Sequence, residues 1–244
     1  MRLLLLTLPT AAENVALDDA LLQVCEAAAG DEDTDVLRVW EALTPAVVLG
    51  RSSRLEREVD VDACRAWQIP VVRRPSGGAA VVVGPGCLMY SIILSYSRWP
   101  QLRSIDFAHR FILGKIRQAV GPSQPPVVLA GTSDLAMDGD PPRKFSGNSL
   151  RCRPHSLLYH GTLLYDFPLP LLGTCLRSPP REPEYRGGRR HDEFVGNLPR
   201  TAAQLQQGLV EAWGASDPLL DWPRGLTTQL VADKYSAEAW TAIL

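Results

Sequence analysis

Residues 73–87 read RRPSGGAAVVVGPGC, a stretch that combines two arginines, a glycine-bearing loop and a run of valines. The runs PVVRR at 70–74 and VVV at 81–83 have the β-branched composition of strands, with a glycine-bearing loop between them. Arg73 and Arg74 place two cations beside a Ser-Gly-Gly step whose backbone amides are bare. A phosphate or carboxylate can approach such a loop closely. A tight turn is the simpler alternative, because paired glycines are common after strands.

A second segment, RKFSGNSL at 143–150, contains one of only three lysines in the chain. Lys144 follows the turn MDGDPPR at 137–143 and precedes Ser-Gly-Asn, which we expect to form another turn. A lysine held there could neutralise charge on a phosphate or an oxyanion. A solvated surface lysine is the alternative.

A third segment, LLYHGTLLYDF at 157–167, is an apolar strand interrupted by His160, Gly161 and Thr162. Glycine within a strand often marks the close approach of a ligand or of another backbone. A core histidine with satisfied hydrogen bonds is the alternative reading of His160.

The rest of the chain alternates strand-like and helix-like patterns. Asn14 would cap the first helix and Gly30 would end it, while Asp60 or Asp62 would begin a second. We expect helices at 14–29, 59–69, 104–120 and 201–213, strands at 3–8, 36–42 and 45–50, and a short tail after the last helix. The stretch 179–190, rich in proline and arginine, is either an ordered loop or a mobile lid. These patterns predict a mixed sheet of the α/β or α+β kind.

Composition excludes several classes of protein. The chain has 244 residues, 45% hydrophobic and 21% charged, which is typical of a packed globular domain and not of disorder. A net charge of −2 gives no overall positive field to hold nucleic acid. The apolar run near the N-terminus is short and broken by Pro9, so we expect neither a signal peptide nor a membrane span. Five cysteines without a CxxC pair favour reduced thiols in the cytoplasm.

Together the three segments resemble the lipoate-protein ligase family, within the wider group of biotin ligases and lipoyl or octanoyl transferases. The ordered set of the RRxSGG loop, the KxSG motif and, sixteen residues after its lysine, HGT is specific. The resemblance extends along nearly the whole chain. Further matching stretches are ENVALDDALL at 13–22, VVLGRSS at 47–53, GCLMYS at 86–91, GTSDL at 131–135 and PEYRGGRRHDEFVGNLP at 183–199.

The resemblance implies an α/β fold, a mixed sheet with flanking helices related to class II aminoacyl-tRNA synthetases and biotin ligases. Residues 1–244 would form a single catalytic domain. Residues 226–244 resemble the linker that leads into a small accessory domain in longer ligases, and the chain stops there. A small accessory subunit could dock on Tyr235 and Trp240; alternatively, both aromatic rings fold back onto the domain.

The resemblance also implies a reaction in two steps. Lipoate or octanoate would attack the α-phosphate of ATP, accompanied by Mg²⁺, to give an acyl-adenylate. A lysine of an apo lipoyl-domain protein, such as glycine cleavage H protein or a 2-oxoacid dehydrogenase E2, would then attack the acyl carbon. No nucleic-acid or membrane partner is implied.

Site residues carry over from the family motifs. Lys144 would be catalytic, acting on charge at the acyl-phosphate centre, and no metal ligand is expected. The expected substrate-binding residues are Arg74, Ser76, Gly77, Gly78, Ala79, Asp134, Ser149, His160 and Thr162.

Departures from the family pattern keep two alternatives open. Val83 stands where many ligases have a histidine, Ser53-Arg54 replaces a frequent Gln-Asn, and GPGCL resembles octanoyl transferases. A transferase would take the acyl group from a carrier protein through a cysteine thioester, without ATP. The segment LAGTSDLAMDGD, where such relatives carry the nucleophile, has no cysteine, and we expect Cys152 to be structural. A non-catalytic acyl binder is the third possibility.

Overall fold

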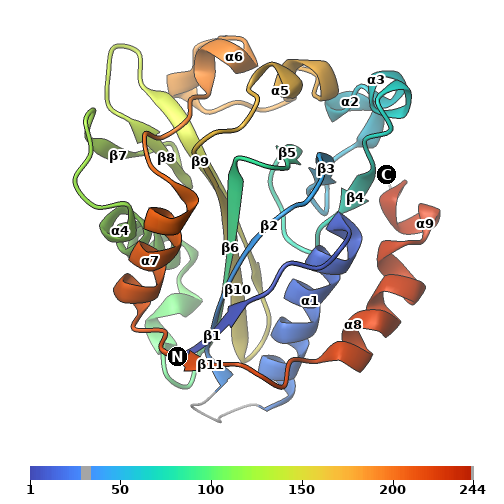
Figure 1. The fold of residues 1–244 in the computed structure, drawn as a ribbon, viewed down its shortest axis with the longest axis vertical. Helices are drawn as coiled ribbons and strands as arrows, with labels where there is room; N and C mark the ends of the chain where they lie inside the picture. Colours follow the sequence, from blue (N-terminus) through green and yellow to red (C-terminus); the bar gives the residue numbers. More distant parts are fainter. Residues whose placement is uncertain (29–33, 243–244) are drawn as a thin grey trace.

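The computed structural model describes residues 1–28 and 34–242 and has two sheets (Figure 1). The main sheet has the strand order β11-β1-β2-β6-β10-β9-β8-β7, and a small sheet has the order β4-β3-β5. The main strands are β1 (Arg2–Leu5), β2 (Val36–Glu41), β6 (Cys87–Ser95), β7 (Val127–Ala130), β8 (Asp134–Met137), β9 (Arg143–Cys152), β10 (Ser156–Leu164) and β11 (Asp217–Pro218). The small sheet comprises β3 (Ala46–Leu49), β4 (Val71–Arg73) and β5 (Val81–Val83).

Helices cover both faces of the main sheet. The long helices are α1 (Ala11–Ala27), α4 (Ile105–Val120) and α7 (Ala202–Trp213). The shorter ones are α2 (Leu55–Glu58), α3 (Val61–Ala66), α5 (Pro170–Cys175), α6 (His191–Phe194), α8 (Arg224–Leu230) and α9 (Glu238–Thr241). In Figure 1, α4 and α7 lie on one face of the sheet and α1 on the other, with α8 packed on α1. The expected mixed sheet with flanking helices is therefore confirmed.

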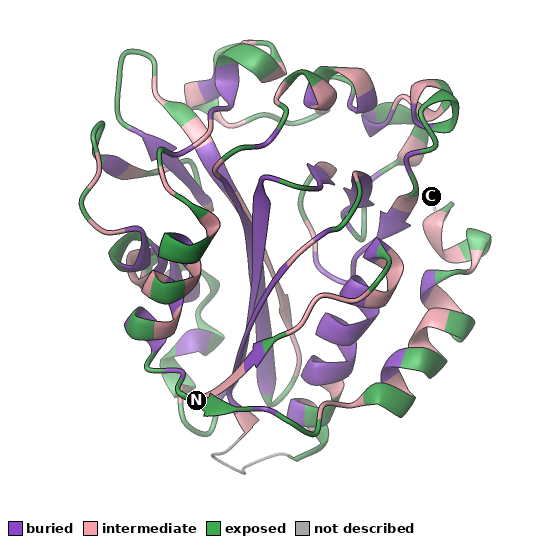
Figure 2. Cartoon of the chain, viewed as in Figure 1, coloured by how far each residue is buried: buried purple, intermediate pink, exposed green. Residues whose placement is uncertain are grey.

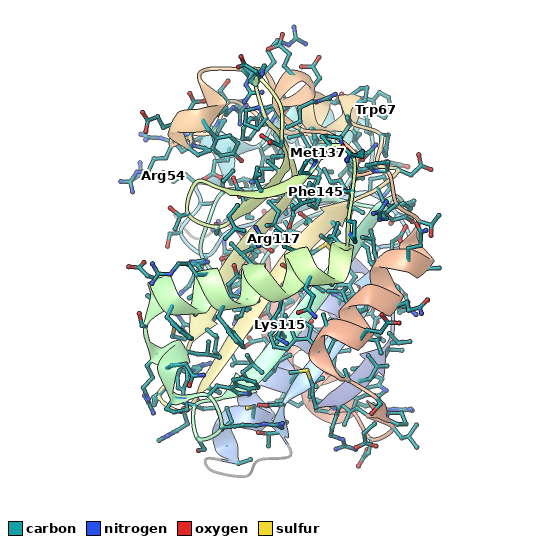
Figure 3. All side chains as sticks on the ribbon, turned by 90° about the vertical axis from the view of Figure 1, so that its left-hand side faces the viewer. Arg54, Trp67, Lys115, Arg117, Met137 and Phe145 are labelled. Atoms are coloured by element: carbon teal, nitrogen blue, oxygen red, sulfur yellow. The ribbon has the colours of Figure 1, made fainter. Side chains whose placement is uncertain are left out.

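The interface between α4, α7 and the sheet forms a large apolar cluster that includes Phe145 and Met137. Figure 3 looks onto this face, where α4 crosses the strands and Lys115 projects from it. The Lys115 ammonium donates to the backbone carbonyl of Ala212 on α7, at 3.0 Å. This lysine therefore has a structural role in joining the two helices.

Helix α1 is buried on nearly all sides, between the two sheets and α8 (Figure 2). It begins at Ala11, capped by a reciprocal pair of hydrogen bonds between Thr10 and Glu13. The expected cap at Asn14 is wrong, because this residue lies one turn inside the helix. Its side-chain amide donates hydrogen bonds to the backbone carbonyls of Leu8 and Thr10. The expected stop at Gly30 lies outside the described residues.

Two helix starts are confirmed, since Ser104 caps α4 and Thr201 caps α7. Asp60 likewise caps α3. This helix is shorter than expected and occupies only the middle of the range 59–69. The tail is not the expected short extension: α8, a π-helical turn at Val231–Tyr235 and α9 all fold onto α1 and β4. No helix of the described part combines the length and apolarity needed to cross a bilayer.

The hairpin of β8 and β9 carries Lys144. The turn at 137–143 joins the two strands as expected. A second turn at Ser-Gly-Asn does not form, because β9 runs on through Gly147 to Cys152 and pairs with β10. An irregularity in the register after Leu135 absorbs the extra residue of β9. The lysine is therefore held on a paired strand and not on a loop.

Candidate functional site

Two adjoining cavities open beside β9 and β10. The first, the Trp40 cavity, has a volume of about 400 Å³ and apolar walls from Val15, Trp40, Val48 and Met89. The second, the arginine cavity, is lined by Arg177, Arg181, Arg186 and His191 together with apolar side chains. Lys144, Thr162 and Arg181 line both cavities. A volume of this size is within the range of small-molecule sites.

The structure gathers the expected site residues around these cavities. Eight of them line the Trp40 cavity: Arg74, Gly78, Ala79, Asp134, Lys144, Ser149, His160 and Thr162. The other two, Ser76 and Gly77, lie directly behind the wall. The Ser76 hydroxyl contacts His160 at 2.5 Å, and the carbonyl of Gly77 accepts a hydrogen bond from the Ser149 hydroxyl at 2.8 Å.

Arg74 organises the glycine-bearing loop. Its guanidinium donates to the carbonyls of Val48, Gly77 and Ala79 and to the Ser76 hydroxyl, at 2.5 to 3.1 Å. Burial lowers its pKa to about 10, so it stays charged at neutral pH. Gly78 has a φ of +83°, and a Cβ there would stand 3.0 Å from the Arg74 guanidinium. Glycine is therefore required at this position, and the loop is wound tightly around a cation.

Arg73 does not face the cavities, contrary to the expectation of two cations in the loop. Its guanidinium is fully buried and donates to the carbonyls of Gly50 and Ser53 on one side. On the other side it donates to the carbonyls of Trp240 and Thr241. Arg73 therefore fastens the C-terminal segment to the loop after β3.

A buried chain of polar groups holds His160. The His160 Nε2 atom contacts the Ser76 hydroxyl, and Nδ1 lies 3.4 Å from the Asp18 carboxylate. Asp18 is also bound by the Arg38 guanidinium at 2.6 Å and by the Ser91 hydroxyl at 2.6 Å. Burial raises the pKa of Asp18, but Arg38 and the hydrogen bonds from His160 and Ser91 outweigh it, and the pKa lies below its usual value. His160 is thus both a satisfied buried residue and a wall of the Trp40 cavity.

Lys144 is paired with Asp134. The Lys144 ammonium lies 2.8 Å from one oxygen of Asp134, whose other oxygen accepts from the Tyr185 hydroxyl at 2.8 Å. A Cβ at Gly147 would stand 2.8 Å from the Lys144 Nζ atom, so the lysine lies across this glycine. The glycine of the KxSG motif therefore makes room for the lysine beside it.

Gly161 serves a different neighbour from the one expected. A Cβ built at Gly161 would lie only 1.8 Å from the Asn148 amide oxygen, so any side chain there would overlap this oxygen. Asn148 also accepts from the Tyr90 hydroxyl and donates to the carbonyl of Ser133 at 2.8 Å. The close approach at Gly161 is thus made by a side chain of β9.

Sequence reasoning missed several parts of the site. The sequence pattern assigns Trp40 only to a strand. It places Asp18 only within a stretch that matches the family. Arg177, Arg181 and Tyr185 belong to the segment between α5 and α6, which is ordered through contacts with the β8–β9 hairpin. Five arginines and one tyrosine over 177–190 were the available signal.

The cysteines lie away from both cavities. All five are among the described residues, all are free thiols, and none lines either cavity. Cys152 packs against the apolar cluster under α4, whereas Ser149 on the same strand lines the Trp40 cavity. Burial, with a contribution from Glu41, raises the pKa of Cys87 far above its usual value. No thiolate nucleophile is positioned at the site.

Other carboxylates near the cavities are engaged. Glu58 accepts from the backbone amide of Ala80 at 2.7 Å, and Glu182 pairs with Arg186. Across residues 1–28 and 34–242 no group of three or more acidic, histidine or cysteine side chains could hold a metal ion.

The C-terminal aromatic rings fold back onto the chain. Tyr235 is buried and its hydroxyl donates to Asp19 at 2.7 Å, while Lys234 binds the same oxygen at 2.8 Å. The Trp240 indole donates to the backbone carbonyl of Arg73 at 2.8 Å. The idea that Tyr235 and Trp240 are exposed docking anchors is therefore wrong, and the alternative holds, because both rings have partners within the domain.

Comparison with known proteins gives consistent matches. The model of the lipoyl protein ligase A/B catalytic domain matches residues 10–209. The octanoyltransferase LipM of an Exiguobacterium species is 26% identical, over 94% of this chain and 93% of its own. The lipoate-protein ligase LplJ of Bacillus subtilis is 27% identical, over 63% of this chain and 44% of its own. This chain spans only 52% and 42% of the first two ligase relatives.

Solved structures share the fold. A bi-partite lipoate protein ligase from Thermoplasma acidophilum, studied with its E2 lipoyl domain, has a TM-score of 0.84 at 23% identity, covering 100% of this chain and 96% of that one. A lipoate-protein ligase A bound with ATP has a TM-score of 0.77 at 24% identity, covering 100% of this chain and 99% of that one.

Proposed function

The chain belongs to the family of lipoyl protein ligase A/B catalytic domains, and from this premise we propose that it attaches lipoate or octanoate to a lysine of a lipoyl-domain protein through an acyl-adenylate made from ATP. One observation carries the choice of ATP over a thioester. Lys144 stands where the two cavities adjoin, and none of the five cysteines, all of them described, lines either cavity.

The Trp40 cavity suits a medium-length acyl chain. Its walls from Val15, Trp40, Val48 and Met89 are apolar, whereas Lys144 and Ser149 line it at β9. A carboxylic acid would therefore bind with its chain against the apolar walls and its charged head at Lys144. A phosphate that enters from the arginine cavity would then meet the same lysine, which lines both cavities.

The arginine cavity suits the nucleotide. Arg181 lines both cavities and, within the described part of the chain, makes no ion pair, so its charge is available to a phosphate. Mg²⁺ usually binds through substrate phosphates with only one or two carboxylates. The carboxylates here are already paired, so Mg²⁺ would enter with ATP as part of that substrate.

The chemistry assigned to the chain is mainly electrostatic. In the first step an acyl carboxylate oxygen attacks the α-phosphorus and pyrophosphate leaves, so one anion must approach another. The Lys144 ammonium, fixed by Asp134, would reduce that repulsion. In the second step the acceptor amine forms the amide bond and AMP leaves with the bonding electrons.

The second candidate is an octanoyl transfer reaction without ATP. The match to LipM over 93% of that relative favours it, because the ligase relatives are covered only in part. The positions of the thiols count against it, since Cys152 lies on the face of β9 that packs under α4. A non-catalytic binder would have no need for the paired lysine at the junction of the cavities.

The proposed partners are apo lipoyl-domain proteins, either glycine cleavage H protein or a 2-oxoacid dehydrogenase E2. The likeness to a ligase studied with its E2 lipoyl domain supports this class of acceptor. We also propose that residues 1–244 act as one catalytic domain. That ligase is bi-partite, so a small accessory subunit remains part of the proposal, with a docking surface other than Tyr235 and Trp240.

The deciding experiment compares acyl donors on one acceptor. Purified protein is mixed with an apo lipoyl domain and either octanoate or lipoate, with and without Mg-ATP, and the acceptor is weighed by mass spectrometry. A parallel reaction supplies octanoyl-carrier protein without ATP. ATP-dependent addition of the acyl mass supports the ligase, whereas addition only from the carrier donor replaces it with the transferase.

A further inference from the structure

We infer that Tyr185 is a positioning residue for Lys144, acting through the Asp134 carboxylate and coupling the arginine-rich segment 177–190 to the reacting centre. Only the expected fall in the rate of acyl-adenylate formation rests on the proposed function. Its structural basis is a shared carboxylate: the Lys144 ammonium occupies one oxygen and the Tyr185 hydroxyl the other, each at 2.8 Å.

The carboxylate is well enclosed. The Asp134 side chain is only 10% exposed, so water has little access to replace a missing partner. Burial, and then the negative charge of Asp134, raise the pKa of Tyr185 well above its usual value. The phenol therefore remains a proton donor throughout the pH range of a normal assay.

The Tyr185 ring is fixed by packing on two sides. It lies 5.1 Å from the ring of Phe194, measured between centroids. On the other side a Cβ at Gly131 would stand 3.4 Å from the Tyr185 ring, so a glycine in the turn before β8 admits it. Removing only the hydroxyl should therefore leave the ring in place.

The same segment is tied to the lysine hairpin at a second point. The Arg189 guanidinium donates to the carbonyl of Pro142 at 2.9 Å, two residues before Lys144, and to the carbonyl of Tyr185 at 2.7 Å. Arg181, from the same segment, lines both cavities. The segment that contributes a cation to the cavities therefore also sets the hydrogen bonding of the lysine.

The effect on Lys144 follows from the geometry of the carboxylate. With the phenol in place, the ammonium is bound by one oxygen and keeps its other N–H groups for an incoming anion. Without it, the second oxygen has no donor, and the ammonium is drawn across both oxygens. The lysine would then be held more tightly by Asp134 and less well placed for the phosphate.

The test compares Tyr185→Phe with Tyr165→Phe. Tyr165 is a matched control because its hydroxyl binds Glu41 and it lines neither cavity. A thermal melt checks that both variants fold. Lysine reactivity is then measured with an amine acylating reagent and mass spectrometry, with Lys115 and Lys234 as internal references. This readout needs no enzyme activity.

We expect Tyr185→Phe to slow the labelling of Lys144 about threefold relative to the two reference lysines. We expect its kcat for acyl-adenylate formation to fall about tenfold, with the KM for the acyl acid unchanged, because a hydrogen bond to a charged group is lost. Tyr165→Phe should match the wild type in both. In an Asp134→Asn background, Tyr185→Phe should have no further effect, because its path through the carboxylate is already broken.

Two results would overturn the inference: wild-type labelling of Lys144 in Tyr185→Phe, or a full tenfold loss that persists in the Asp134→Asn background. A wild-type protein that forms no acyl-adenylate would instead refute the proposed function. The labelling comparison would still decide the role of Tyr185 in that case.

Discussion

Replacing Lys144 by alanine should abolish most acyl-adenylate formation while leaving the fold intact. Lys144 lines both cavities, and its ammonium is held by a salt bridge to Asp134. Its side chain is 26% exposed, so it is neither part of the core nor freely solvated.

The size of the loss follows from Coulomb's law. Opposite unit charges about 3.5 Å apart attract by about 5 kcal/mol at an effective dielectric constant of about 20. Partial exposure of Lys144 brings solvent screening, which reduces this to about 3 kcal/mol, similar to the loss of one preorganised donor in other sites. That corresponds to a rate reduced by about two orders of magnitude. The cost in stability should stay near 1 kcal/mol, because the pair is partly solvated and Tyr185 still binds Asp134.

The assay measures pyrophosphate release with octanoate and ATP, together with a thermal melt of each variant. Lys115→Ala is the control, since the Lys115 ammonium donates to the Ala212 carbonyl on α7 and Lys115 lines neither cavity. A Lys144→Ala protein that folds and keeps more than about a tenth of the wild-type rate would refute the electrostatic role.

Three further outcomes follow from the same structure. Gly147→Ala should fold normally but lose about tenfold in rate, because its Cβ would displace the Lys144 ammonium; pyrophosphate release against the melt checks this. Cys152→Ser should change the acylation of a lipoyl domain less than about twofold, and a dead variant would instead favour the thioester route. Asp18→Asn should lower the free energy of unfolding by about 3 kcal/mol at pH 7, since Arg38 is left buried without its charge partner. Because the pKa of Asp18 is depressed in the folded protein, this contribution is present above about pH 4 and is lost as the pH falls further, so urea unfolding of variant and wild type should converge in acid.

Local signals predicted the parts of the fold that depend on neighbouring residues. Ser104 and Thr201 cap their helices because a short side chain with an oxygen lies just before an amphipathic run. The same rule failed at Asn14, where the residue type fits a cap but the chain already has a better one at Thr10. Asn14 instead bonds the Arg38 guanidinium at 2.5 Å, a partner 24 residues away that no local pattern reveals.

The sequence motifs pointed to residues that line the cavities, whereas neighbours that only the tertiary fold brings together were missed. His160 lies on a paired strand as its apolar surroundings predict, whereas Lys144, expected between two turns, lies on the paired strand β9. The turn expected at Ser-Gly-Asn does not form, because Gly147 gives space to the Lys144 side chain and does not bend the strand. The contact of Tyr185 could not be found from sequence, since its partner Asp134 lies 51 residues earlier and only the folded chain brings the two side chains together.

The departures from the family pattern bear on whether the site has decayed. Val83, which stands where many ligases have a histidine, is fully buried in β5 and lines neither cavity. Ser53 faces the glycine loop, where its hydroxyl donates to the Gly78 carbonyl at 3.1 Å and its own carbonyl accepts from Arg73. Both departures therefore alter the support of the loop and not the polar groups of the cavities. A relaxed site would be expected to lose the costly buried charges first, yet Asp18 and Arg38 remain paired behind His160. The departures from the family pattern therefore give little support to a non-catalytic binder. The valine at position 83 is better explained by packing within the small sheet.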